Sequence, residues 1–332
     1  RKIMSMPKGK SHGLMLLLDY SGSMNNNMAG SIEQILVLTM FCRKVNIPFS
    51  VYAFSNCPAT RVTDFPGTNV GDFESRNSFS RNINELHFNN VVLREYLNSN
   101  MSNNEFNRAM KNMILLRQSY INNMAGCFVA RPPSERLSNT PLNEAMVAMA
   151  PIMRNFKASR KLDMTSLIVV HDGDADSTNF RVSETGKSYA GYFDIKKENV
   201  ILTDNKFKYQ KKIEANPYQH HNASVTTSIF NWFSHVTGSK VIGFFIVPPN
   251  RSLWKSVNER YVTTEKKSVY HTFREKGIGW DYSAYKEAVQ TYAKKLRSEG
   301  FLESNNDGYE SFFLILGGKE LLSSEDEIEI EG

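Results

Sequence analysis

Three short segments of this 332-residue chain carry the oxygen-bearing side chains that a hard divalent cation prefers. The first runs from Asp19 to Ser23 with the sequence Asp-Tyr-Ser-Gly-Ser, the second is Asn-Thr-Pro-Leu at 139–142, and the third is His-Asp-Gly at 171–173. Mg²⁺ takes near-octahedral oxygen coordination and keeps several waters, which suits hydroxyls as direct ligands and carboxylates that act partly through water. The three segments are therefore candidates for one magnesium site.

Two of these segments follow predicted strands. The apolar run 14–18 predicts a buried parallel strand that ends just before Asp19, and it should be the first, central strand of a sheet. The apolar run 166–170 predicts another such strand that ends just before Asp172. Open α/β sheets bind ligands beyond the carboxyl ends of their strands, so we expect the segments to meet at that edge.

The segment with Thr140 opens a predicted helix. Pro141 is typical of a first helical turn, and residues 142–156 continue the helix, with Thr140 expected as its cap. Another helix at 32–45 leads to a strand at 49–54. Such strand-helix-strand units cross over in one hand and indicate an α/β fold with a doubly wound, mostly parallel central sheet flanked by helices. The other predicted elements are helices at 104–124, 224–236 and 283–297 and strands at 240–247 and 311–316.

Polar stretches indicate how the chain is organised. We expect a weak hairpin and irregular chain over 56–90, and a β-ribbon near 189–193 and 200–203. The chain begins with Arg1, and a strand follows almost at once. The predicted organisation is residues 1–11 as the N-terminal remnant of a longer chain, residues 12–317 as one domain, insertions within it at about 177–218 and 250–281, and residues 318–332 as an acidic, disordered tail.

Composition and charge narrow the setting. No apolar run approaches the ~20 residues of a membrane-spanning helix, and three cysteines at irregular spacing suit neither a disulfide framework nor a zinc site, so no membrane association and a cytoplasmic location are expected. The net charge is +6, but residues 325–331 hold five acidic side chains, which leaves +11 on residues 1–324. Basic clusters at 196–212 and 251–276 would suit nucleic acid or an acidic partner, but solvated loops are the favoured interpretation.

The three segments together resemble the metal-ion-dependent adhesion site of von Willebrand factor A (VWA) domains. The Asp-x-Ser-x-Ser motif at Asp19, Ser21 and Ser23, the separate Thr140 and the Asp-Gly at Asp172 match the three parts of that site. The resemblance implies a Rossmann-like VWA fold in which both serines bind Mg²⁺ directly, the threonine binds directly or through water, and the two aspartates lie behind them. Mn²⁺ and Ca²⁺ are alternative ions. An acidic side chain of a partner protein would fill the sixth coordination position.

Residues 12–317 are also similar to the VWA subunit of CobT-type cobaltochelatases and its phage-encoded relatives, through Thr-Pro-Leu at a helix start and Asp-Gly before an acidic, Ser/Thr-rich stretch. In that family the subunit works with a ring-forming MoxR-like AAA+ ATPase, which implies a Mg²⁺-dependent adaptor here. Two alternatives stay open: a structural or virion assembly protein that uses the VWA fold as an interaction surface, and the VWA subunit of a metal chelatase. Frequent Asn, as at 25–27, is typical of an AT-rich phage genome, which would place the protein in host cytoplasm or in the virion.

Residues around the motifs argue against an enzyme. A haloacid dehalogenase phosphatase needs Asp where this chain has Ser21, and the Gly-Lys-Ser tripeptides at 9–11 and 186–188 lack the upstream glycine of a phosphate-binding loop. Ser21 also lies outside any Gly-x-Ser-x-Gly elbow, and neither His12 nor His171 has an evident triad role. No catalytic residue is therefore predicted.

Other candidate sites have simpler interpretations. Asp174 and Asp176 continue an alternating pattern typical of a calcium loop, but its sixth position is Ser177, so an EF-hand is excluded and a solvated loop is favoured over tuning of the metal site. The His-His pair at 220–221 lacks a third ligand, and an exposed loop is expected. Aromatic and basic residues within 251–280 could stack on nucleic-acid bases, although a protein interface or a small core is favoured.

Overall fold

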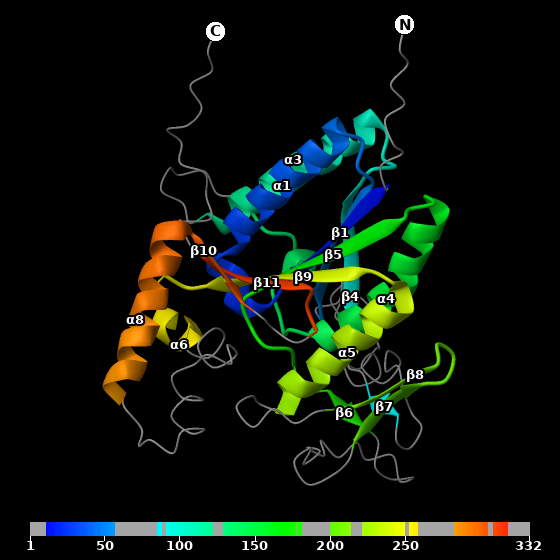
Figure 1. Ribbon diagram of the computed structural model, residues 1–332. Helices are drawn as coiled ribbons and strands as arrows, with labels where there is room; N and C mark the ends of the chain where they lie inside the picture. The colour runs from blue at the N-terminus through cyan, green and yellow to red at the C-terminus, as the bar shows by residue number, and fades with distance from the viewer. Residues whose placement is uncertain are drawn as a thin grey trace, which may run out of the picture.

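The computed structural model of the chain describes residues 11–56, 85–87, 91–121, 129–176, 178–180, 200–213, 221–249, 252–257, 282–304 and 308–317. A seven-stranded sheet lies at its centre, in the order β10-β11-β9-β5-β1-β2-β4 (Figure 1). Its strands are β1 (His12–Asp19), β2 (Phe49–Ser55), β4 (Val92–Asn98), β5 (Met164–His171), β9 (Lys240–Val247), β10 (Phe301–Ser304) and β11 (Ser311–Leu316). The strands from β11 to β2 run parallel, and the two edge strands are antiparallel to their neighbours. A mixed α/β fold with a mostly parallel sheet is therefore confirmed.

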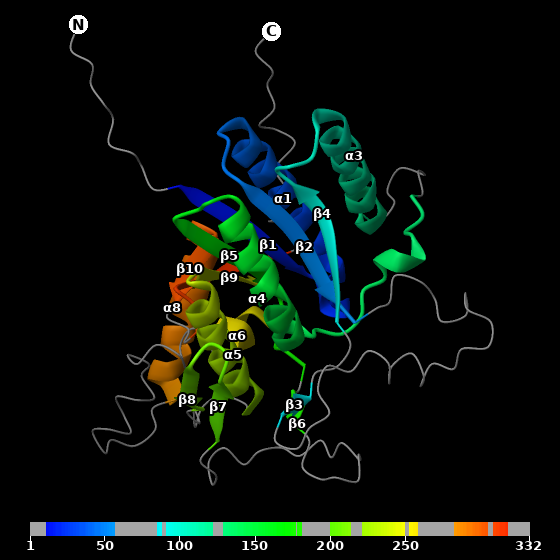
Figure 2. The ribbon, with the colours of Figure 1, turned by 90° about the vertical axis from the view of Figure 1, so that its right-hand side faces the viewer.

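Helices cover both faces of this sheet. Helices α1 (Met28–Lys44) and α3 (Asn103–Tyr120) pack together on one face, and α4 (Leu142–Ser159) and α5 (His221–Thr237) pack together on the other (Figures 1 and 2). Near the β10-β11-β9 end, α6 (Ser252–Val257) and α8 (Tyr282–Glu299) contribute to a third apolar cluster. The short elements are the 3-10 turns η1 (Gly22–Asn26) and η3 (Pro133–Glu135), the two-residue pair β3 (Leu86–His87) and β6 (Asn179–Phe180), and the ribbon β7 (Ile201–Asp204) and β8 (Tyr209–Lys212).

Strand β1 shows why the sequence runs apolar without alternation. Met15 and Leu17 belong to the core under α4 and α5, whereas Leu16 and Leu18 belong to the core under α1 and α3. All four side chains are almost fully buried. A parallel strand covered by helices on both faces needs apolar residues at every position. The same burial fixes Asp19 at the end of the strand, at the carboxyl edge of the sheet.

The predicted helices and strands that fall in described residues are present, with ends that differ by a few residues. Two strands were not predicted. β4 and β10 lie at the sheet edges, are only partly buried and carry charged residues such as Arg94 and Glu303, so neither forms an apolar run. The ribbon strand predicted at 200–203 pairs with β8, while residues 189–193 lie outside the described residues.

The expected insertions are described only in part. Within the second, α6 places Leu253 and Val257 in the core with no exposed surface, so this part belongs to the fold. Residues 1–10 and 318–332 and most of 56–90 lie outside the described residues. Among the described helices, none has the length and apolar character needed to cross a lipid bilayer.

Candidate metal centre

Asp19 anchors the first loop. Its side chain is fully buried at the end of β1. Its Oδ1 accepts a hydrogen bond from the Ser21 backbone N–H at 2.9 Å, and its Oδ2 accepts one from Ser21 Oγ at 3.0 Å. The carboxylate therefore fixes both the turn after β1 and the direction of the Ser21 hydroxyl.

The hydroxyls of the motif join Asp19 to Asp172. Ser21 Oγ and Ser23 Oγ lie 2.9 Å apart, and Ser23 Oγ donates to Asp172 Oδ1 at 2.5 Å. The other oxygen of Asp172 accepts from Asn27 Nδ2 at 3.1 Å. An oxygen-rich row thus runs from the end of β1 to the end of β5.

Thr140 lies on the other side of Gly173. A Cβ built on Gly173 would lie 3.8 Å from Ser23 Oγ and 4.0 Å from Thr140 Oγ1, so both hydroxyls border the same small space. Thr140 is buried, and its carbonyl accepts hydrogen bonds from Leu142 N at 2.7 Å and Asp176 N at 2.9 Å. The N-cap of α4 is Pro141, with no side-chain cap bond, so the prediction of Thr140 as cap was wrong. Its hydroxyl instead lies near the hydroxyl of Ser23.

Backbone hydrogen bonds hold the first two loops together. Ser138 N donates to Tyr20 O at 3.0 Å, and Gly22 N donates to Ser138 O at 2.7 Å, which makes a parallel bridge between Ser21 and Ser138. Asn139 N also donates to Asn56 Oδ1 at 3.1 Å. These bonds set the position of Ser21 relative to the loop that carries Thr140.

Electrostatics make this arrangement costly when no cation is bound. Burial raises the pKa of Asp19 well above its ordinary value, and the negative charge of Asp172 raises it further. Burial also raises the pKa of Asp172, although hydrogen bonds from Ser23 and Asn27 oppose the shift. Burial raises the pKa of Asp176 as well. A divalent cation between these side chains would offset the repulsion and the desolvation.

Proton counting supports a cation at the two serines. A hydroxyl has one proton, and Ser21 and Ser23 each give theirs to an aspartate when both carboxylates are ionised. No proton then lies between the two Oγ atoms, although they are only 2.9 Å apart. Their lone pairs face each other, which is the arrangement of two ligands of one ion. The donor set fits Mg²⁺, which prefers oxygen ligands.

All five predicted site residues lie in this region: hydrogen bonds connect Asp19, Ser21, Ser23 and Asp172, and Thr140 lies beside Gly173. Asn27 was not predicted, and the only sequence signal for it was its place in an Asn run at the start of α1. In the described part of the chain, no group of three or more His, Cys, Asp or Glu side chains is placed to hold an ion. The candidate centre has two carboxylates, and its other donors are hydroxyls.

Other candidates do not extend this centre. His171 is buried, with Nδ1 2.8 Å from Gly173 O and Nε2 3.2 Å from Tyr309 Oη, so its contacts support the loop. The lysines of the β7-β8 ribbon are exposed, in keeping with solvated side chains. The side chains of the His pair at 220–221 and the aromatic residues after position 257 lie outside the described residues.

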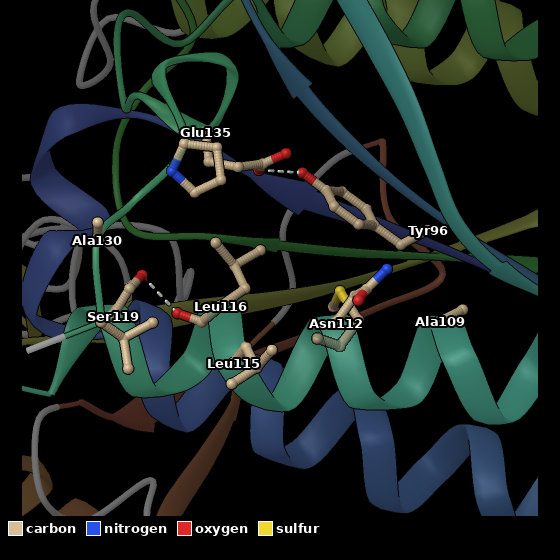
Figure 3. Close-up of a pocket in the computed structure, with 11 residues that line it drawn as sticks. Tyr96, Ala109, Asn112, Leu115, Leu116, Ser119, Ala130 and Glu135 are labelled. Atoms are coloured by element: carbon tan, nitrogen blue, oxygen red, sulfur yellow. Dashed lines mark hydrogen bonds between the residues drawn. The ribbon is translucent and has the colours of Figure 1, made fainter. Parts of the chain in front are cut away.

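A pocket of about 400 Å³ lies behind the first loop, between α3, β4 and residues 129–135. Tyr96 and Glu135 line it, and the Tyr96 hydroxyl donates to Glu135 Oε2 at 2.6 Å (Figure 3). The Tyr96 ring also stacks on Tyr20, with 6.0 Å between ring centroids. Tyr20 lies between Asp19 and Ser21, so the pocket wall contacts the loop of the candidate centre.

Comparisons with known proteins give little. The chain matches no known family and no curated protein. Among solved structures it is similar to the pilus adhesin SpaC from Lactobacillus rhamnosus GG in the open conformation, at 9% identity and a TM-score of 0.38. The match covers 90% of this chain and 33% of the adhesin chain, so this chain spans about a third of that length. At this TM-score the likeness carries no argument about fold or function.

Proposed function

We propose that the chain is a Mg²⁺-dependent protein-binding module with a doubly wound VWA fold. The observation that carries this proposal is the pair of serine hydroxyls at 2.9 Å, each able to donate its proton to a different buried aspartate. A merely polar turn would explain one such loop. It would not explain why loops after β1 and β5 and before α4 bring their oxygens together.

In this proposal Ser21 and Ser23 hold Mg²⁺ directly, and Thr140 holds it directly or through water. Asp19 and Asp172 orient the serine hydroxyls and balance the charge. The bound ion supplies a positive centre with a coordination position open to an acidic side chain. Gly22, Ser23 and Asp174 are exposed beside the centre, so a partner can approach from solvent.

The proposed role is that of an adaptor in the cytoplasm rather than an enzyme. The partner would be a protein that presents a carboxylate, and the resemblance to CobT-type subunits favours a MoxR-like AAA+ ATPase that the module couples to a substrate. Nucleic acid and membrane are not expected as partners. The site offers hydroxyls and carboxylates, and no activated nucleophile is part of the proposal.

Isothermal titration with Mg²⁺, Mn²⁺ and Ca²⁺ tests the site directly. We expect wild type to bind one ion and Ser21→Ala/Ser23→Ala to bind none. The matched control is Ser228→Ala, because Ser228 is also buried but donates to Ser224 O within α5. Circular dichroism should show that all three proteins are folded.

A pull-down from native lysate then tests the function. Wild type and Ser21→Ala/Ser23→Ala are each used with Mg²⁺ or EDTA, and retained proteins are identified by mass spectrometry. A protein retained only by wild type with Mg²⁺ supports the adaptor role. The same proteins in every condition, or none, would count against a metal-dependent interaction.

A further inference from the structure

The chain leaves the central sheet beside the candidate centre. β11 runs parallel to β9, β5 and β1, so its carboxyl end lies at the same edge of the sheet as Asp19 and Asp172. Gly317 follows β11, and its N–H donates to Val247 O at 2.8 Å. A Cβ on Gly317 would overlap Asn27 Oδ1. The backbone of Gly317 is thus packed against the residue that donates to Asp172.

The sequence after Gly317 is strongly acidic. Residues 318–332 contain one lysine and six carboxylates, a net charge of −5, which leaves +11 on residues 1–317. The acidic positions are Glu320, Glu325, Asp326, Glu327, Glu329 and Glu331. An acidic side chain is the group that the open coordination position of the proposed ion would take.

The tail is long enough to reach the centre. An extended chain covers about 3.3 Å per residue, so Glu320 can lie about 10 Å from Gly317 and Glu331 about 46 Å away. Gly317 contacts Asn27, and Asn27 is 3.1 Å from Asp172, so the required span is short. A short flexible linker gives a tethered ligand an effective concentration in the millimolar range. A carboxylate held there would compete with any partner.

We infer that a carboxylate of residues 318–332 binds the metal centre of its own chain and occupies the position that a partner's acidic residue would take. This inference rests on the proposed Mg²⁺ site. The tail then acts as an intramolecular competitor, and a partner binds by displacing it. The ligand class of the site is accordingly a flexible acidic peptide.

The test compares the full-length chain with a tail-amide variant. This variant carries Glu320→Gln, Glu325→Gln, Asp326→Asn, Glu327→Gln, Glu329→Gln and Glu331→Gln. The probe is a fluorescent peptide with the sequence of residues 318–332, followed by anisotropy with Mg²⁺ or EDTA. The charge control is Glu287→Gln/Glu299→Gln/Glu303→Gln, which removes exposed carboxylates from α8 and β10.

We expect the peptide to bind the tail-amide variant at least tenfold more tightly than wild type or the charge control, and only with Mg²⁺. Adding Ser21→Ala/Ser23→Ala to the tail-amide variant should abolish this binding. Equal peptide binding by wild type and the tail-amide variant, or binding by neither, would overturn the inference.

Two further measurements separate the possible failures. Mg²⁺ titration without peptide shows whether wild type binds the ion: if it does not, the proposed function fails together with the inference. If wild type and the tail-amide variant bind Mg²⁺ equally and neither binds peptide, only the inference fails. Sedimentation covers exchange between copies, because a Mg²⁺-dependent dimer of wild type that the tail-amide variant does not form would show that the tail acts on a second copy.

Discussion

At the scale of single residues, Asp172→Asn tests the proton count. An amide at 172 can accept from Asn27 and donate to Ser23 Oγ, so Ser23 can give its proton to Ser21 and no lone pairs are opposed. One buried negative charge also disappears. We expect the metal-free variant to be more stable than wild type by about 1 kcal/mol, with much weaker Mg²⁺ binding. Urea unfolding in EDTA measures the first effect, and a less stable variant would contradict the count.

Gly173→Ala separates metal binding from folding. Its Cβ would make ordinary van der Waals contacts, at 3.8 and 4.0 Å, with the hydroxyls of Ser23 and Thr140. We therefore expect unfolding in EDTA to change by less than about 0.5 kcal/mol. The methyl group would border the space between those hydroxyls, so Mg²⁺ affinity should fall at least tenfold.

Gly243→Ala is the matched control. Its Cβ would lie 2.5 Å from the Tyr309 ring and 2.6 Å from the Phe312 ring, in the core of β9 and β11. Overpacking of this kind costs about 1–3 kcal/mol and does not touch the metal loops. Equal loss of Mg²⁺ affinity in both glycine variants would show that the effect is not local.

At the scale of elements, the bond from Tyr96 to Glu135 ties β4 to the segment that leads into the site. Ser138 lies three residues after Glu135 and bonds to the backbone of Tyr20 and Gly22. Tyr96→Phe would leave a poorly exposed carboxylate without this donor, at a cost of about 1–3 kcal/mol. Urea unfolding measures it, and the double variant Tyr96→Phe/Glu135→Gln should recover part of the loss. No recovery would argue against the bond as the cause.

The same tyrosines predict how stability depends on high pH. Burial raises the pKa of Tyr120 to about 12 and raises that of Tyr96 as well. The unfolded chain loses these protons near pH 10, whereas the folded chain keeps them, so unfolding releases protons above pH 10. Stability should be unaffected by these groups below about pH 9 and fall between about pH 10 and 12. Tyr96→Phe should flatten this decline, and an equal slope in wild type and variant would contradict the assignment.

Elements buried on two faces could be predicted because burial leaves a pattern in the sequence. β1 and β5 are apolar runs that end in the site loops, which is why Asp19 and Asp172 were found from sequence. β4 and β10 are edge strands, and half-exposed edges tolerate charged residues. Asn27 was missed because its role depends on a contact with a residue 145 positions away, which no local pattern records.

At the scale of the whole molecule, metal binding and folding should be linked, because an ion that binds only the folded chain stabilises it. At a Mg²⁺ concentration a hundred times the Kd, this stabilisation is about 2.7 kcal/mol. Leu17→Ala should lower stability by about 2–5 kcal/mol, since Leu17 is fully buried in the core, but it should keep the same Mg²⁺ increment. Ser23→Ala should lose the increment and change metal-free stability little, because its side chain is exposed.

Denaturant unfolding with Mg²⁺ or EDTA gives both quantities for each protein. A Leu17→Ala increment smaller than that of wild type would mean that the core and the site are energetically coupled through β1, which joins them. Equal increments would mean that the sheet holds the loops rigidly enough for the site to keep its affinity while the core is weakened. The second outcome is expected, because the site loops are also held by their own backbone bonds at Tyr20, Gly22 and Ser138.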